Sequence, residues 1–324
     1  MTHTNLQRAT SSATGGPANG GPATGGIATM GPARRTPAAR GLIAAAVILT
    51  LLFILAPLLI IFDQAFAKGL AYYRESILHP ETLHAIWLTV LTALVVVPLN
   101  LLFGLTAAWA ITKFEFRGKK LLLTAIDIPF SVSPIVAGVC YLLLYGAQGL
   151  LGPTLMDHDI RIMFSVPAIM LVTLFVTSPF VVRELVPLMQ IQGRDQEEVA
   201  ATLGASGWQI FRRVTLPNIK WALLYGAVLC NARVMGEFGA VSVVSGNVRG
   251  ETNTLPLQIQ LLYHDYNATG AFAAATVLTL LAVVTLVLKA ILEQRTAGRN
   301  RLGAHSVVDK SVDSANPSPA AKRV

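Results

Sequence analysis

Three ionisable residues, Asp127, Arg233 and Glu237, fall inside long apolar runs of this chain. In a hydrocarbon layer such groups are costly, and they usually face the interior of a helix bundle or a water-filled cavity. Arg233 and Glu237 are four residues apart and would share one helix face. They could form a self-neutralising pair that fixes their helix. Equally, Arg233 could lie along the path of an anion, with Glu237 setting its orientation or closing a gate.

Asp127 precedes Ile128 and Pro129, where a break in the helix would free backbone groups. We expect its carboxylate to cap the broken turn or to pair with Arg233. A structural role is favoured over a place on a translocation path, although both remain open.

A charged segment at about 189–218 interrupts the apolar runs and holds the second group of candidate residues. Its acidic residues stand near the start of a short helix predicted at 196–203, where the helix dipole favours negative charge. Gly204 is expected to end this helix in the left-handed conformation. Small side chains at Ala200 and Ala201 would let the helix lie deep in a partner's groove. The alternative is an amphipathic surface helix anchored by Trp208.

The composition indicates a polytopic membrane protein, because 53% of residues are hydrophobic and only 13% are charged. Soluble domains average roughly 25% charged residues. Each of six apolar segments is long enough to cross a hydrocarbon core of about 30 Å. We therefore predict an all-α bundle of six transmembrane spans. The spans lie at about 42–62, 85–111, 121–147, 163–188, 219–245 and 269–291.

The chain is expected to contain one membrane domain, 41–295, between two cytoplasmic tails, 1–40 and 296–324. The first tail is rich in Gly, Pro, Ala and Thr. Such a composition buries too little apolar surface to offset the entropy of ordering, so disorder is predicted for it. The C-terminal tail is predicted to be disordered for the same reason.

Lysines and arginines gather on one side of the predicted spans. They precede the first span, lie between the second and third, surround the charged segment and close the chain. The positive-inside rule then places both termini and the charged segment in the cytoplasm. The formal net charge of +8 does not indicate nucleic-acid binding, because the basic residues form no patch interleaved with aromatic residues. The basic residues on the opposite side are Lys68, Arg74, Arg161 and Arg249.

The charged segment resembles the EAA motif of importer-type ABC transporter permeases, E-A-A-x3-G-x9-I-x-L-P. Glu198 and Ala200 match its start, with Val199 in place of one alanine, and Val214 stands in place of the isoleucine. In that family this cytoplasmic loop forms a coupling helix that docks on an ATPase subunit. The resemblance implies that role for Glu197, Glu198, Ala200, Ala201, Gly204, Leu216 and Pro217.

A second resemblance is more specific. Residues 232–246 read A-R-V-M-G-E-F-G-A-V-S-V-V-S-G and are similar to the A-R-x-x-G-E-F-G-A-V segment of sulfate/thiosulfate permeases. The continuation, N-V-R-G-E-T at 247–252 and L-P-L-Q-I at 255–259, resembles the W-type subunit rather than the T-type. The resemblance covers about residues 41–295.

The resemblance implies the type I ABC importer fold and a non-catalytic subunit of the bacterial inner membrane. Its expected partners are a dimer of ATPase subunits, a T-type permease, a periplasmic sulfate/thiosulfate-binding protein and the lipid bilayer. ATP and magnesium would bind to the ATPase. No cofactor is expected on this chain, which has no phosphate-binding loop: the nearest sequence, Gly118-Lys119-Lys120, lacks the required Ser or Thr.

Three other functions would each require particular sequence features. An ABC permease for another oxyanion, such as molybdate, or for another solute would share the EAA-like loop, and only the segment at 232–246 favours sulfate. An ion-coupled secondary transporter would need several intramembrane carboxylates and often inverted repeats, whereas Asp127 and Glu237 are the candidates here and no repeat is visible. A membrane-embedded enzyme would need a nucleophile–base or metal-binding motif, and the sequence carries no H-E-x-x-H or G-x-S-x-G.

Overall fold

The computed structural model describes residues 37–288 and 290–291, and they form helices joined by loops and turns. The chain divides into two compact units, Met1–Ile54 and Leu55–Val324. In the first unit the described residues form the beginning of α1, Pro37–Phe66, an apolar helix whose residues 41–66 reach a mean hydropathy of 3.0. The predicted tails fall outside the described residues, apart from 37–40.

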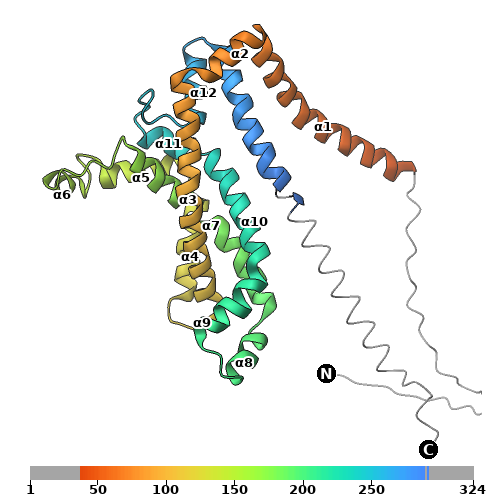
Figure 1. Ribbon diagram of the computed structural model, residues 1–324, viewed down its shortest axis with the longest axis vertical. Coiled ribbons are helices and arrows are strands. Elements are labelled where there is room, and N and C mark those ends of the chain that lie inside the picture. The colour runs from red at the N-terminus through yellow and green to blue at the C-terminus, as the bar shows by residue number, and fades with distance from the viewer. Residues whose placement is uncertain (1–36, 289, 292–324) are drawn as a thin grey trace, which may run out of the picture. The chain divides into compact units, whose positions relative to one another are not determined.

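In the second unit, the helices α3, α7 and α10 run side by side and pack against one another (Figure 1). The described elements after α1 are α2 (Gly69–Leu78), α3 (Pro80–Lys113), α4 (Lys119–Ser131), α5 (Pro134–Tyr145), α6 (Gly152–Asp157), α7 (Val166–Gln192), α8 (Asp195–Thr202), α9 (Gly207–Ile210), the π-helix η1 (Phe211–Thr215), α10 (Leu216–Met235), α11 (Gly239–Val244), α12 (Leu255–His264) and a last helix, Ala268–Leu288. The all-α fold class is confirmed for this part of the chain.

The core consists of two apolar clusters. The first joins α3, α7 and α10, with Val96, Leu185 and Ile219 fully buried. The second joins α5, α7 and α11 around residues such as Ile169 and Val241. Both clusters are built mainly from Ala, Val, Leu and Ile, whose close contacts supply the attraction between helices where lipid takes the place of water.

Two of the six predicted spans are interrupted in the structure. The segment 121–147 is broken into α4 and α5, which are bent by 108° at Val132 and Ser133. Ser133 is extended and Pro134 begins the next helix, because the residue before a proline is disfavoured in helical conformation. Four described helices are long and apolar enough to cross a membrane, or five if the bent pair counts as one.

The fifth predicted segment, 219–245, is also interrupted. Helix α10 ends at Met235, and α11 begins only at Gly239. The pieces beyond the two breaks, α5 and α11, pack against each other. Gly138 permits this, since a Cβ added there would lie 2.8 Å from the carbonyl oxygen of Ala240. The two interruptions therefore form one packed feature of the fold.

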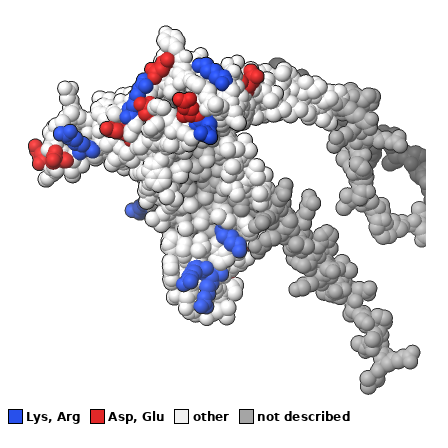
Figure 2. Space-filling view, turned by 45° about the horizontal axis from the view of Figure 1, so that its top comes forward, with Lys and Arg blue, Asp and Glu red and all other residues white. Residues whose placement is uncertain are grey.

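Charge is distributed as expected for a membrane protein. In Figure 2 basic side chains gather at the lower end, the end at which α8 and α9 lie in Figure 1. Acidic and basic side chains mix at the opposite end, and on the face shown the surface between is largely uncharged. A band of this kind suits the hydrocarbon region of a bilayer.

Candidate functional site

The charged segment folds as the sequence predicts, with small shifts at its boundaries. Helix α8 spans Asp195–Thr202, and Gly204 follows it with φ of +82°. Ser206 then caps α9 in a reciprocal capping box with Gln209. The chain continues through η1 directly into α10, with Pro217 in the first turn, where a proline is tolerated.

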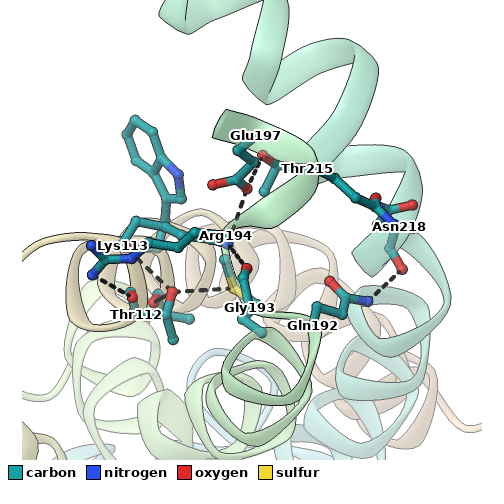
Figure 3. Close-up of polar contacts among 12 residues, drawn as sticks. Thr112, Lys113, Gln192, Gly193, Arg194, Glu197, Thr215 and Asn218 are labelled. Carbon is teal, nitrogen blue, oxygen red and sulfur yellow. Dashed lines mark hydrogen bonds and ion pairs between the residues drawn. The ribbon is translucent and has the colours of Figure 1, made fainter. Parts of the chain in front are cut away.

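Glu197 turns toward the bundle and not outward. Its Oε1 lies 3.1 Å from Lys113 Nζ at the end of α3 and accepts a hydrogen bond of 2.7 Å from Thr215 Oγ1. Lys113 Nζ also donates to the carbonyl oxygen of Gly193 at 2.7 Å (Figure 3). The side chains of Lys113 and Glu197 are only 9% and 19% exposed. This group, which we call the Lys113–Glu197 clamp, ties α8 to both α3 and η1.

Further contacts fasten the two ends of the segment. Asn218 at the start of α10 donates to Gln196 Oε1 at 2.6 Å, and its carbonyl oxygen accepts from Gln192 at 3.3 Å. Arg194 donates to the carbonyl oxygen of Thr112 at 3.3 Å (Figure 3). The loop is thus held as one piece on the ends of α3, α7 and α10.

Glu115, in the loop between α3 and α4, extends this polar network. Its carboxylate lies 2.9 Å from Lys119 Nζ and 3.8 Å from Arg194. The hydrogen bond from Lys119, helped by that residue's positive charge, lowers the pKa of Glu115. The carboxylate is therefore ionised at neutral pH and available to Arg194.

The outward face of the segment is partly apolar. Val199, Leu203 and Trp208 are exposed, and the Trp208 ring stacks on Phe211. Of the residues that the motif singles out, Glu198, Ala201, Gly204 and Pro217 are exposed, whereas Ala200 and Leu216 are half-buried. Exposed apolar residues beside charged ones are typical of a protein–protein contact. The role of this segment in coupling to an ATPase remains a prediction, and the exposed face suits that role.

Arg233 and Glu237 do contact each other, with Arg233 Nη1 2.5 Å from Glu237 Oε2. Glu237 lies beyond the end of α10, so the two residues do not share a helix face as predicted. Its side chain is 1% exposed, and its Oε1 accepts a hydrogen bond from the backbone N–H of Ala240 at 3.1 Å. The pair therefore spans the break between α10 and α11. A place on a path or in a gate remains a prediction.

We expect Arg233→Ala to destabilise the folded structure around the break between α10 and α11, because it leaves the Glu237 carboxylate buried without its cation. Loss of one partner of a buried ion pair costs about 3–5 kcal/mol. The measurement is the amount of chain in the membrane and its thermal stability in detergent. If Arg233→Ala inserts normally with unchanged stability but transports poorly, the structural explanation is wrong and the path explanation stands.

Asp127 does not pair with Arg233 as expected. Its Oδ1 accepts from Nε and Nη2 of Arg183, at 3.0 and 2.8 Å. The reason is packing: α4, which carries Asp127, lies against α7, which carries Arg183. In the sequence, Arg183 is one of the basic residues that precede the charged segment. A usable signal was present, since Arg183 falls inside the predicted span 163–188. Lys113 and Thr215 were missed because only the folded chain brings them to Glu197.

Residues 100–298 match the family described as "Binding-protein-dependent transport system inner membrane component". The chain belongs to this family. As a member of it, the chain is an inner-membrane permease with several apolar helices.

Two relatives in this family are sulfate permeases by name. The chain is 58% identical over 260 residues to the sulfate transport system permease protein CysW of Escherichia coli K12, covering 80% of this chain and 89% of that protein. Identity to the permease protein CysT of the same organism is 36% over 241 residues, covering 72% and 87%. Among solved structures, a bacterial ABC transporter that imports alginate aligns with a TM-score of 0.67 at 17% identity, covering 80% of this chain and 94% of that one. That likeness supports the importer-permease fold.

Proposed function

We propose that this chain is the membrane-spanning permease subunit of an ATP-driven ABC importer that carries sulfate into the cytoplasm. The observation that carries the proposal is the 58% identity, over most of both chains, to a sulfate permease of the CysW type. The lower identity to CysT favours the W-type role. These relatives favour sulfate over molybdate, and thiosulfate is proposed as a second substrate.

The complete importer would contain further subunits. A CysT-like permease would complete the membrane part, and a periplasmic binding protein would deliver the anion, in line with the family description. Two ATPase subunits would bind ATP and magnesium, so this chain would need no cofactor of its own. Both termini and the segment 189–218 would face the cytoplasm, as the distribution of lysine and arginine favours.

The geometry suggests how work would pass from the ATPase to the membrane. Val199, Leu203 and Trp208 present an exposed surface for docking. The Lys113–Glu197 clamp joins that surface to α3, and η1 joins it to α10 without a loop. A displacement of α8 would then move the ends of several helices together. Such a rigid connection suits alternating access, in which bundles rock around a central site.

The test is uptake of radiolabelled sulfate in cells deleted for this chain and then complemented. We expect uptake to fall on deletion, to return with the wild-type gene, and to be reduced by unlabelled thiosulfate more than by molybdate. If sulfate uptake survives deletion while molybdate uptake falls, the assignment of sulfate is wrong and the permease class stands.

A further inference from the structure

Helix α4 carries a polar stripe on a surface that the rest of the described chain leaves open. Thr124, Asp127 and Ser131 are spaced by three and four residues, which places them on one helix face. Thr124 and Ser131 are exposed, and Asp127 is half-exposed. The neighbouring exposed residues, Leu121 and Ile128, are apolar. Leu121 and Ile128 are three residues before and four residues after Thr124, so they lie on the same exposed face as the stripe.

Arg183 reaches this stripe from α7. Its guanidinium group lies 3.9 Å from the centroid of the Phe130 ring and holds Asp127 through one carboxylate oxygen. The Arg183 and Asp127 side chains are 44% and 49% exposed, in contrast to the buried carboxylate of Glu237. Arg183 uses its Nε and Nη2 donors on Asp127. A guanidinium group has five N–H donors in all.

A half-exposed ion pair within apolar helices is costly if it faces lipid, so it must face water or another polar surface. The hydroxyl groups beside it, Thr124 and Ser131, donate to the carbonyl oxygens of Lys120 and Asp127, at 3.0 and 3.3 Å, and can still accept hydrogen bonds from water. Arginine binds oxyanions well, because its planar fork of donors matches two oxygen atoms at once. A pair of no net charge would attract a divalent oxyanion only weakly. Weak binding is what transport needs, since the ion must leave the site as readily as it enters.

Resting on the proposed function, we infer that the face formed by Thr124, Asp127, Ser131 and Arg183 lines a water-filled path for the anion. Arg183 is the cation that the passing oxyanion contacts. When the anion leaves, the guanidinium group forms its ion pair with Asp127 again. Asp127 thereby sets how long the anion stays. Arg183, and not Arg233, is then the anion-contacting arginine of this chain.

Water access can be measured without measuring transport. In the assembled complex, with exposed Cys140 changed to serine, single variants Thr124→Cys and Ser131→Cys are treated with a charged thiol reagent. We expect labelling at least about tenfold faster than for Leu280→Cys, because a thiol ionises and reacts only where water reaches it. Leu280 is the control, since it is 62% exposed on the last helix, and Val283 and Val284, which share its face, are also exposed and apolar. Sulfate should slow the reaction at Thr124 and Ser131 only. Equal rates at all three positions, or no labelling, would overturn the proposal.

Transport variants separate a path role from a structural one. Arg183→Gln should reduce sulfate uptake at least about tenfold, and Arg183→Lys should retain part of it, because lysine keeps the charge but not the bidentate fork. Asp127→Asn should lower both KM and the maximal rate, since an unopposed Arg183 holds the anion longer. If the double variant Arg183→Gln with Asp127→Asn regains uptake, the pair is only structural and the proposal fails. If labelling is protected by another oxyanion but not by sulfate, the path stands and the assigned substrate fails.

Discussion

Glu197→Ala is expected to abolish coupled transport while the chain still inserts into the membrane. The substitution removes the acceptor for both Lys113 and Thr215, and leaves the largely buried Lys113 ammonium group with only the carbonyl oxygen of Gly193. A lost hydrogen bond to a charged group costs about 2 kcal/mol, which is enough to free α8 from α3 for much of the time. ATP hydrolysis should then continue in the complex with little sulfate uptake.

Glu198→Ala is the control for the order of the segment and not for uptake, because Glu198 is itself expected at the contact with the ATPase. Glu198 is the next residue of the same helix, carries the same charge and points outward. Hydrogen–deuterium exchange of residues 193–216, measured on this chain without the ATPase, should speed up in Glu197→Ala and not in Glu198→Ala. Unchanged exchange in Glu197→Ala would mean that the clamp does not order the segment.

Gly204→Trp is expected to give the second large loss of transport, and Gly204→Ala a smaller one. The backbone at Gly204 has φ of +82°, and an added Cβ would meet no atom within 4 Å. Alanine therefore adds only conformational strain, about 1–2 kcal/mol. Tryptophan adds the same strain and also a bulky ring on the face proposed to dock on the ATPase. The measurements are sulfate uptake and the amount of ATPase subunit that co-purifies with the chain; both report backbone strain and the bulky ring together.

Gly207 provides the control for Gly204. An added Cβ there would also meet no atom within 4 Å, and its φ lies outside the left-handed region. Because Gly207 begins α9, Gly207→Ala should leave uptake unchanged or stabilise the helix by up to about 1 kcal/mol. Full transport by Gly204→Trp would contradict the coupling role of this segment.

Local sequence was sufficient to predict several features of the fold. Apolar runs predicted the helices, and Gly204 predicted the end of α8, because backbone conformation there depends on one residue type. A break was expected at Pro129, but Pro129 lies inside α4 and the chain bends at Val132 and Ser133. The break after Met235 was missed. Prolines were visible throughout the spans, and hydropathy does not say which of them bends a helix by 108°. Whether the backbone groups freed by a proline find other partners depends on the neighbouring helices.

The partners of charged residues were less predictable. The contact between Arg233 and Glu237 was predicted because it is local in sequence. Asp127 was expected to cap the broken turn or to pair with Arg233, and its partner is Arg183. The inward orientation of Glu197 was not foreseen. Both errors concern contacts between residues far apart in the chain, Asp127 with Arg183 and Lys113 with Glu197. Such contacts are decided by which helices pack together, and spacing along one helix carries no information about that.

The π-helix between the charged segment and α10 has a geometric consequence. A π-turn contains one residue more than the α-helical turn that it replaces. One residue corresponds to a rotation of about 100° around an α-helix axis. The direction in which Trp208 and its neighbours point is therefore fixed relative to α10 by the number of residues in Phe211–Thr215. The number of residues in this stretch sets the rotation of the charged segment about the axis of α10. Adding or removing one residue would therefore turn the exposed surface around Trp208 to a new direction, even if every side chain on it were kept.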